Sequence, residues 1–314
     1  MILHYLLRRL FLLAFVFVAL TVFAFSLGYL FPGEVLNNFT GLQNISPAEE
    51  VVLSQQLGLE QNYLQQYLLF LQRLLDGQWA LSFSSQQNVL TEMLLVMPAT
   101  LELAAYALFL SLLIGIPLGI IAAVRKDKWL DKVISSLALI GFSVPIFWWA
   151  LLLIMVFSLS LGWLPTSGRL SVLYEIEPDT GFMLLDILFA DVSYRQQAMF
   201  DALRHMLLPA VVLATYPTTV MIRFTRDSML DVLEQNYIKT ARAKGLTRLQ
   251  VLYTHGLRNA LLPVTRQVGL QFSTLITLAM ITEVIFSWPG IGRWLIDSIY
   301  QRNFPAIQIG RAHV

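Results

Sequence analysis

Long apolar runs separated by polar segments dominate the hydropathy pattern of this chain. The runs lie at about 10–31, 103–124, 133–161, 206–222 and 267–286. A helix that crosses the hydrocarbon core of a bilayer needs about 20 apolar residues, so each run predicts one transmembrane helix. Pro145 lies inside the third run, where it predicts a kink. Residues 1–33 carry no signal-peptide cleavage pattern, so we interpret them as a retained N-terminal transmembrane helix.

The polar segment at 34–96 contains a different, amphipathic pattern. Pro47, Glu49 and Glu50 suit the start of a helix, and Gly77 suits its end. At helical spacing, the apolar positions in between form one stripe, which consists of Leu57, Leu64, Leu68 and Leu71. The pattern therefore predicts an amphipathic helix over about 47–76, lying on the membrane surface or on the helix bundle.

Composition supports a membrane protein. Hydrophobic residues make up 57% of the chain and charged residues 13%, whereas soluble proteins carry roughly 25% charged residues. The chain has no cysteine, which excludes a disulfide framework and a thiolate metal site. Its four histidines show no ligand spacing, so we expect no metal site, and nothing in the pattern suggests binding to nucleic acid.

The distribution of basic residues predicts the orientation of the spans. Fourteen of the 21 Lys and Arg residues fall in three segments, 1–9, 125–132 and 223–266. Basic residues next to spans favour the cytoplasmic side. We therefore expect a cytoplasmic N-terminus, with 34–96 and 163–205 exported. The acids of the second exported segment could favour a positively charged cargo or a docking protein, or could simply be solvated.

The most informative segment is 237–263, which reads YIKTARAKGLTRLQVLYTHGLRNALLP. We call it the basic loop. It is helix-compatible, and it lies between two apolar runs, with Gly245 near its middle and Pro263 at its end. On composition alone, a helix stop followed by an ordinary surface turn explains it as well as a binding element does.

The basic loop resembles the loop by which membrane permeases of ATP-binding-cassette (ABC) importers contact their ATPase. The amino-acid sequence of the loop is most similar to that of the oligopeptide, dipeptide and nickel branch of this family. The blocks MPATLELA (97–104), GFSVPIFWWALLL (141–153) and TEVIFSWPGIGRWLIDSI (282–299) show the same resemblance. The segments LYEIEPDTGF and RHMLLPAV are most similar to the B-type permease subgroup of Sap peptide transporters.

The resemblance implies a fold and a set of site residues. The fold is an all-α membrane protein of the type I ABC importer permease class, with its core domain at 97–308. The family's Glu-Ala-Ala motif falls on Lys239, Thr240 and Ala241. Of these three residues, only Ala241 matches the motif. The implied ATPase-coupling residues are Lys239, Thr240, Ala241, Arg242, Gly245, Leu246, Arg258, Asn259 and Pro263.

Gly245 is expected to form a sharp bend between two short helices, because glycine tolerates a positive φ. Arg242, Lys244, Arg248 and Arg258 could meet acidic groups around the groove of an ATPase. Each of these cations is explained equally well by positive-inside topology alone.

Three further residues are candidates for a translocation path. Glu283 is the only acid embedded in an apolar run, and acids within membranes are often functional. It could contact a cationic substrate, or it could be an interfacial acid that nearby groups cap. Trp148 and Trp149 follow Pro145 and are candidates for path lining, with packing as the more common role.

The chain has no G-x-x-x-x-G-K-[ST] loop, so we expect no ATPase activity and no bound cofactor of its own. The resemblance implies partners: a homologous second permease, two ATP-binding subunits that use ATP, an exported solute-binding protein and membrane lipid. The expected function is the permease subunit of an ATP-driven transporter for peptides or related cationic solutes in a bacterial inner membrane. The alternatives are a secondary transporter or an intramembrane enzyme, but the sequence shows neither an internal repeat nor paired polar groups at membrane depth.

The C-terminus carries a separate expectation. Five spans from a cytoplasmic N-terminus would leave the C-terminus exported, whereas the family resemblance implies six spans. The last residues, IGRAHV at 309–314, match the translation of a common sequencing adapter. We therefore expect a non-native tail at 309–314 and a sixth apolar run in the full-length gene.

Overall fold

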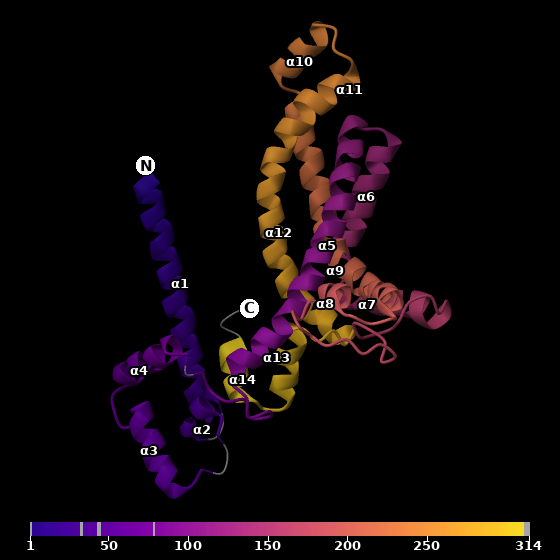
Figure 1. Ribbon diagram of the computed structural model, residues 1–314. Helices are drawn as coiled ribbons and strands as arrows, with labels where there is room; N and C mark the ends of the chain where they lie inside the picture. The colour runs from indigo at the N-terminus through magenta and orange to yellow at the C-terminus, as the bar shows by residue number, and fades with distance from the viewer. Residues whose placement is uncertain (1, 32–33, 43–44, 78, 311–314) are drawn as a thin grey trace. The chain divides into compact units, whose positions relative to one another are not determined.

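The computed structural model describes residues 2–31, 34–42, 45–77 and 79–310 (Figure 1). Residues 311–314, part of the expected non-native tail, lie outside the described residues. The chain forms two compact units. The first is built from the residues up to Val96 together with those from Trp294 onward, and the second is Met97–Arg293.

The described residues are mostly helical. The helices are α1 (Ile2–Leu30), α2 (Val35–Thr40), α3 (Pro47–Leu57), α4 (Tyr63–Leu75), α5 (Val89–Val124), α6 (Trp129–Ser143), α7 (Ile146–Leu153), α8 (Met183–Phe189), α9 (Arg195–Leu233), α10 (Asn236–Ala243), α11 (Arg248–Gln250), α12 (Arg258–Ile285), α13 (Ile291–Tyr300) and α14 (Phe304–Gly310). Two π-helical segments, η1 (Ile154–Ser160) and η2 (Val251–Leu257), continue α7 and precede α12.

Four helical stretches within the described residues are long and apolar enough to cross a membrane: His4–Leu30, Val89–Val124, Arg195–Leu233 and Arg248–Ile285. Each begins before one of the predicted spans and covers it to within one residue of its end. The third predicted span differs, because α6 and the α7–η1 helix meet at a bend of 103°. If this bent pair counts as one span, the number rises to five.

The bend at Pro145 is a break, where we expected a kink. Val144 and Pro145 both have extended backbones, with ψ of 125° and 131°. A proline disfavours the helical region for the residue before it, so α6 ends at Ser143 and a new helix begins at Ile146.

The predicted amphipathic helix at 47–76 is also two helices. Its start is as expected, because α3 begins at Pro47 behind a capping box made by Ser46 and Glu49. Gly58 then ends α3 in the left-handed conformation, with a φ of 65°, and Asn62 caps α4. The predicted leucine stripe is split accordingly, since Leu57 is buried whereas Leu64 and Leu68 of α4 are exposed.

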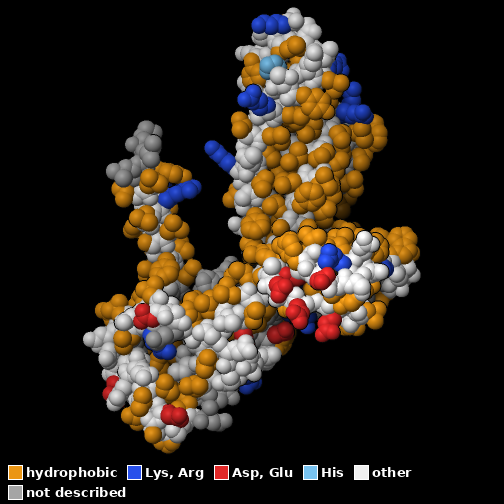
Figure 2. All heavy atoms as spheres, viewed as in Figure 1, with side chains coloured by type: hydrophobic (Ala, Val, Ile, Leu, Met, Phe, Trp, Pro, Cys, Tyr) orange, Lys and Arg blue, Asp and Glu red, His pale blue; other side chains and the backbone are white. Residues whose placement is uncertain are grey.

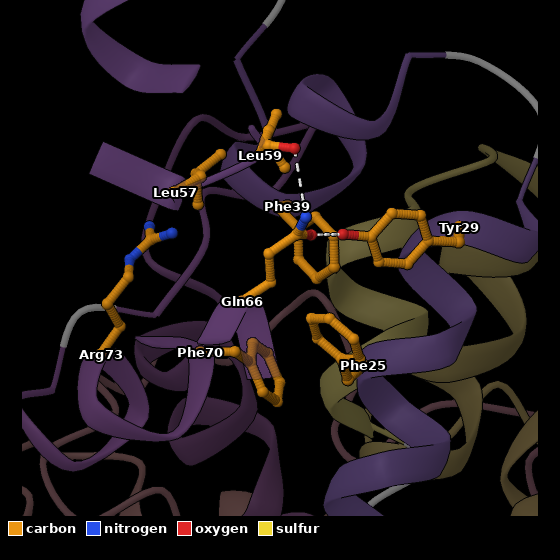
Figure 3. Close-up of a pocket in the computed structure, with 8 residues that line it drawn as sticks. All are labelled: Phe25, Tyr29, Phe39, Leu57, Leu59, Gln66, Phe70 and Arg73. Carbon is orange, nitrogen blue, oxygen red and sulfur yellow. Dashed lines mark hydrogen bonds between the residues drawn. The ribbon is translucent and has the colours of Figure 1, made fainter. Parts of the chain in front are cut away.

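The first unit is held together by aromatic packing between α1, α2 and α4 (Figure 3). The ring of Phe25 lies 5.6 Å from that of Phe39 and 5.7 Å from that of Phe70. The side chain of Gln66 donates to the carbonyl of Leu59 at 3.1 Å and accepts from the hydroxyl of Tyr29. These side chains leave a cavity of only about 10 Å³, so this part of the chain has a well-filled core.

Residues from Trp294 onward, which we expected in the domain 97–308, pack in this first unit. The side-chain amide of Asn303 donates to Ser82 Oγ at 2.7 Å, and its oxygen accepts from the backbone N–H of Phe83 at 2.9 Å. Phe304 stacks on Phe31 with ring centroids 4.6 Å apart. These contacts join positions far apart in sequence, and hydropathy alone cannot reveal them.

The second unit is a bundle in which α5, α6 and α12 pack against α9 (Figure 1). Small residues allow the close contact of α5 with α9. A Cβ atom on Gly115 would lie 2.6 Å from Met221 Cβ, and one on Gly119 would lie 2.7 Å from both the carbonyl oxygen of Ile222 and Thr225 Cβ. Gly115 and Gly119 therefore serve helix packing, as small residues commonly do in membranes.

A Gly119→Ala variant should be less stable than the wild type. The added methyl group meets backbone and Cβ atoms that cannot rotate away, and overpacking of this kind costs about 1–3 kcal/mol. The matched control is Gly269→Ala in α12, where a Cβ has no atom within 4 Å. Thermal unfolding in detergent should show a lowered Tm for the first variant only. Equal Tm values would show that α5 and α9 are not in close contact at this position.

Candidate functional site

The basic loop occupies one end of the α9–α12 helix pair, where Figure 1 shows α10 and α11 together. α9 ends at Leu233, and α10 begins at Asn236 after a short turn. After Gly245 the chain enters α11 and η2, which continue directly into α12. The loop is thus two short helical pieces, one of which is the extension of a membrane-spanning helix.

Gly245 adopts the bend that the sequence analysis expected. Its φ is +85°, in the left-handed region that favours glycine. Its N–H donates to the carbonyl of Arg242 at 3.0 Å, which closes the end of α10. A capping box between Thr247 and Gln250 then starts α11. A Cβ at Gly245 would meet no atom within 4 Å, so the requirement for glycine comes from the backbone alone.

The two pieces of the basic loop share a small apolar core. Ile238, Ala241 and Val251 are buried against one another. Of the three residues at the family's Glu-Ala-Ala position, Ala241 therefore points inward, whereas Lys239 and Thr240 are exposed. The loop is a packed element with its own interior, so its outer surface has a defined shape.

The outer surface of the loop is basic with apolar patches. Arg242, Lys244, Arg248 and Arg258 are all exposed. Large apolar side chains are exposed on the same loop as well, namely Tyr237, Leu246, Leu249, Tyr253 and Leu262. Leu249, Tyr253 and Leu262 are the most exposed of them, at 65%, 66% and 67%, and none of these three was predicted from the sequence as a site residue.

The remaining predicted loop residues lie near the junction with α12. Asn259 donates to the hydroxyl of Tyr237 at 3.1 Å and to the carbonyl of His255 at 3.0 Å, which ties α12 to α10. Pro263 is exposed within the first turns of α12. Asn259 thus stabilises the loop internally, and Pro263 is not part of the core that Ile238, Ala241 and Val251 form.

Polar contacts that were not predicted from the sequence join the end of α9, just before the loop, to the neighbouring α5–α6 hairpin. Arg226 of α9 donates to both carboxylate oxygens of Asp131, at 2.6 and 2.8 Å. Asp131 also accepts from the N–H of Asp127 at 2.9 Å. Lys126 and Glu234 form a second, exposed ion pair at 2.9 Å. No local signal marks these pairs, because the partners lie 95 and 108 positions apart in the sequence.

An Asp131→Asn variant should destabilise the junction between the α5–α6 hairpin and α9 by about 2 kcal/mol, below the roughly 3–5 kcal/mol of a fully buried pair, because water still reaches Arg226. The side chain of Arg226 is 24% exposed and that of Asp131 is 4% exposed. Glu234→Gln, which breaks only the exposed pair, is the control and should change little. Chemical unfolding and protease sensitivity of the loop check both variants. Equal effects of the two would show that burial of the Asp131 pair is immaterial.

Glu283 lies in a closed polar site at the end of α12. It is fully buried, and its Oε1 accepts from the hydroxyl of Thr100 at 2.6 Å. Its Oε2 accepts from the N–H groups of Gly292 and Arg293, at 2.7 and 3.2 Å. These two N–H groups belong to the first turn of α13, whose free donors a carboxylate satisfies well. Of the two roles considered for Glu283, a carboxylate capped by nearby groups describes this arrangement, because the carboxylate is fully buried and faces no open space.

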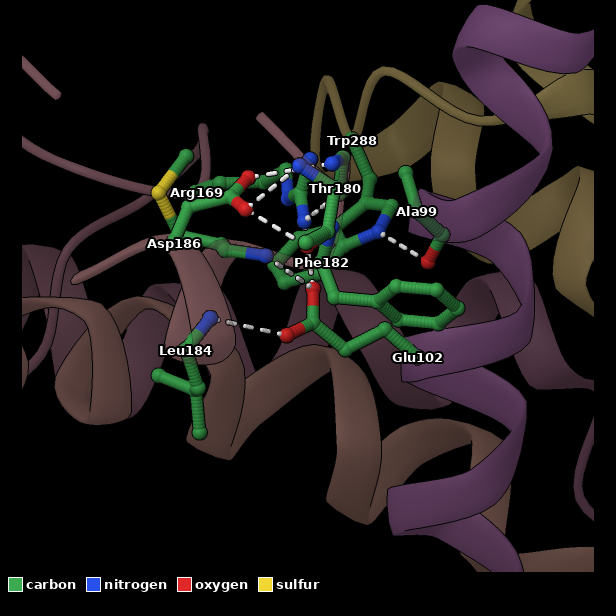
Figure 4. Close-up of polar contacts among 10 residues, drawn as sticks. Ala99, Glu102, Arg169, Thr180, Phe182, Leu184, Asp186 and Trp288 are labelled. Atoms are coloured by element: carbon green, nitrogen blue, oxygen red, sulfur yellow. Dashed lines mark hydrogen bonds and ion pairs between the residues drawn. The ribbon is translucent and has the colours of Figure 1, made fainter. Parts of the chain in front are cut away.

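A second buried carboxylate, Glu102, organises the segment that follows η1 (Figure 4). Arg169 forms an ion pair with it, and the N–H groups of Met183 and Leu184 at the start of α8 donate to it at 3.2 and 3.1 Å. Arg169 also lies over the ring of Trp288 at 5.5 Å. The sequence analysis did not single out Glu102, although it directly precedes an apolar run.

Trp148 and Trp149 occupy different environments. Trp148 is exposed on α7, whereas Trp149 donates from Nε1 to Thr215 Oγ1 at 3.1 Å. Trp149 also lines a groove of about 460 Å³ between α5, α6 and α9, which is mainly apolar. Of the two predicted candidates, only Trp149 therefore faces this groove.

The charged side chains of the second unit lie at opposite ends (Figure 2). On the face that Figure 2 shows, Lys and Arg gather at the α10–α11 end, Asp and Glu gather together with a few Lys and Arg at the end that carries α8, and a hydrophobic surface lies between the two ends. Within the described residues no group of three or more His, Cys, Asp or Glu side chains is arranged to hold a metal ion. The site therefore offers a binding surface and packed helices.

Comparisons with known proteins match nearly the whole chain. Residues 115–312 match the family described as "Binding-protein-dependent transport system inner membrane component". Residues 2–104 match the N-terminal family of the same systems.

Several curated relatives are transport permeases. The chain is 45% identical over 308 residues to the di/tripeptide transport system permease protein DppB of Pseudomonas aeruginosa (strain UCBPP-PA14), covering 98% of this chain and 91% of the relative. It is 43% identical over 304 residues to the peptide transport system permease protein SapB of Salmonella typhimurium (strain LT2), covering 97% and 88%. It is 48% identical over 237 residues to the putrescine export system permease protein SapB of Escherichia coli (strain K12), covering 76% and 74%.

Proposed function

The chain belongs to the family of binding-protein-dependent transport system inner membrane components, and from this membership we propose that it is a permease subunit that an ATPase partner drives through the basic loop. The observation that carries this proposal is the packed loop itself. Ile238, Ala241 and Val251 give the loop an interior, and its outer face presents exposed cations beside Leu249 and Tyr253. Mixed basic and apolar surfaces of this kind suit a protein partner with an acidic groove.

The proposed mechanism is alternating access with the basic loop as a lever. Because η2 continues directly into α12, a displacement of the loop is passed to a membrane-spanning helix. The loop also follows the end of α9, and the Asp131–Arg226 pair passes a displacement of α9 to the α5–α6 hairpin. Since the sequence has no phosphate-binding loop, we infer that ATP is bound by separate subunits and that this chain needs no cofactor.

The proposed assembly places this chain beside a homologous second permease, above two ATP-binding subunits, with an exported binding protein that delivers cargo. The family description and the relatives support such partners in general terms. The proposed cargo is a peptide or a related cationic solute. The relatives' names cover both, since one is a di/tripeptide system and another exports putrescine.

The proposed orientation has the N-terminus and the basic loop in the cytoplasm. The charge separation within the second unit supports it, because basic side chains gather at the loop end (Figure 2). Glu175, Glu177 and Asp179 are exposed within the segment that this orientation places outside.

Site-specific cross-linking tests the proposal. The chain has no native cysteine, so a single Leu249→Cys substitution gives a unique attachment point on the loop. In membranes that also contain the ATP-binding subunits of its transporter, Leu249→Cys should cross-link to an ATP-binding subunit. Leu159→Cys, equally exposed but in η1, should not. Cross-linking of neither variant, together with transport that an ion gradient drives without ATP, would favour a secondary transporter.

A further inference from the structure

Helix α4 has an apolar face that no described residue covers. Leu64, Leu68 and Leu75 are 68%, 55% and 82% exposed. The opposite side of α4 is already used, because Gln66 is buried and Tyr67 and Phe70 pack against Phe25 of α1. The exposed leucines are therefore a second apolar face, separate from the one that holds the first unit together.

The exposed face of α4 is divided into an apolar and a polar part. Successive residues are about 100° apart around an α-helix, so Leu64, Leu68, Leu71 and Leu75 form one stripe along the axis. Gln65 and Gln72, both exposed, lie roughly 70–90° away from the middle of that stripe. A helix with this division suits the boundary between an apolar and an aqueous phase.

The contact of α4 with α1 determines the depth of α4 in the membrane. The hydroxyls of Thr21 and Tyr67 are hydrogen-bonded at 2.8 Å, and the rings of Tyr29 and Tyr63 lie 5.6 Å apart. α1 ends at Leu30, so Thr21 lies about 13 Å along the axis from that end. One leaflet of the hydrocarbon core is about 15 Å thick, so α4 crosses α1 within the depth of a single leaflet.

The neighbouring surface of α1 is a lipid-facing one. The charge-free run from Leu10 to Phe31 is long enough to span the bilayer, and most of its apolar side chains are exposed within the first unit. Arg8 and Arg9 mark the opposite end of this span. The tyrosines at the contact, Tyr29, Tyr63 and Tyr67, are of the type that concentrates at membrane interfaces.

We propose that α4 is embedded in the leaflet opposite Arg8 and Arg9, with Leu64, Leu68, Leu71 and Leu75 in contact with lipid acyl chains and Gln65 and Gln72 directed toward the headgroups and water. The occupant of the apolar stripe is lipid because the stripe lies at the depth of Val22, Phe23 and Leu30, the exposed apolar side chains at this end of α1. This surface is independent of the basic loop and of the cargo.

Spin labels on single cysteines test this placement in the full chain, reconstituted into phosphatidylethanolamine–phosphatidylglycerol vesicles. Leu64→Cys and Gln65→Cys are the matched pair, since both positions are exposed on α4 and lie about 100° apart around its axis. Phe15→Cys in α1 is the lipid reference. Collisions with oxygen report lipid, and collisions with a water-soluble nickel chelate report water. The label at Leu64 should resemble that at Phe15, with an oxygen-to-nickel ratio several-fold above that at Gln65.

Two outcomes would overturn the proposal. Equal nickel accessibility at Leu64 and Gln65 would place the whole face in water. Loss of both oxygen and nickel collisions at Leu64 would show that a protein surface, such as a second permease or a binding protein, covers the stripe. Quenching of a fluorophore on Leu64→Cys by lipids brominated in the acyl chain gives a second measurement, and it should be several-fold stronger than on Gln65→Cys.

Discussion

A Gly245→Val variant should insert into the membrane normally and lose most of its transport, while its partner still hydrolyses ATP. Gly245 holds a φ of +85°, and a residue with a Cβ pays about 1–2 kcal/mol for a left-handed backbone, more if it is β-branched. In most molecules the loop would then no longer adopt the bent conformation, since 1.4 kcal/mol already shifts the equilibrium between the bent and other conformations about ten-fold. Transport per ATP, measured in vesicles, should fall roughly ten-fold.

The control at the same position is Gly245→Asn, because asparagine tolerates the left-handed region better than other residues with a side chain. It should retain more transport than Gly245→Val. Space does not confound this comparison, since no atom lies within 4 Å of a Cβ built there. Normal coupling in the valine variant would remove the basic loop as the lever of the proposed mechanism.

A Glu283→Ala variant should fail to accumulate as a folded protein. The hydroxyl of Thr100 and the N–H groups of Gly292 and Arg293 would lose their shared acceptor. Each buried donor left unsatisfied costs about 1–3 kcal/mol, so the total is about 3 kcal/mol or more before any cavity is counted. Yield after membrane extraction and Tm in detergent measure the loss.

Glu283→Gln separates the two interpretations of this carboxylate. Glutamine keeps an acceptor oxygen, so it should recover part of the stability if Glu283 caps α13. If Glu283 instead bound a cationic cargo, the glutamine variant would fold with unchanged Tm and transport cationic solutes less well. Asp179→Ala removes an exposed acid in the same unit and should alter neither yield nor Tm.

The sequence predicted the long spans well because span length is a local, one-dimensional property. An apolar run of sufficient length needs no information about its neighbours, and four of the five runs lie in single long helices. For the third run the predicted kink was wrong, because the helix breaks at Pro145. Pro145 was recognised, but whether a proline kinks or breaks a helix depends on what satisfies the freed backbone groups nearby.

The prediction of a single amphipathic helix over 47–76 was wrong for a different reason. The leucine spacing in 47–76 is compatible with one helix, and the signals for two helices, Gly58 and Asn62, are weak when read alone. Aromatic packing of Tyr67 and Phe70 against α1 selects the other face of α4 for burial. Periodicity shows that a helix has an apolar face, and it does not show which of two apolar faces the core takes.

The sequence by itself determined the membrane spans, the basic loop with its bend at Gly245, and the family resemblance that the comparisons bear out. Only the tertiary structure decided which polar residues meet. Asp131 pairs with Arg226 across 95 positions, and Thr100 with Glu283 across 183. Such partners are chosen by the packing of helices. A buried charge is stable only where folding brings a matching group within hydrogen-bond distance, and no local pattern encodes that distance.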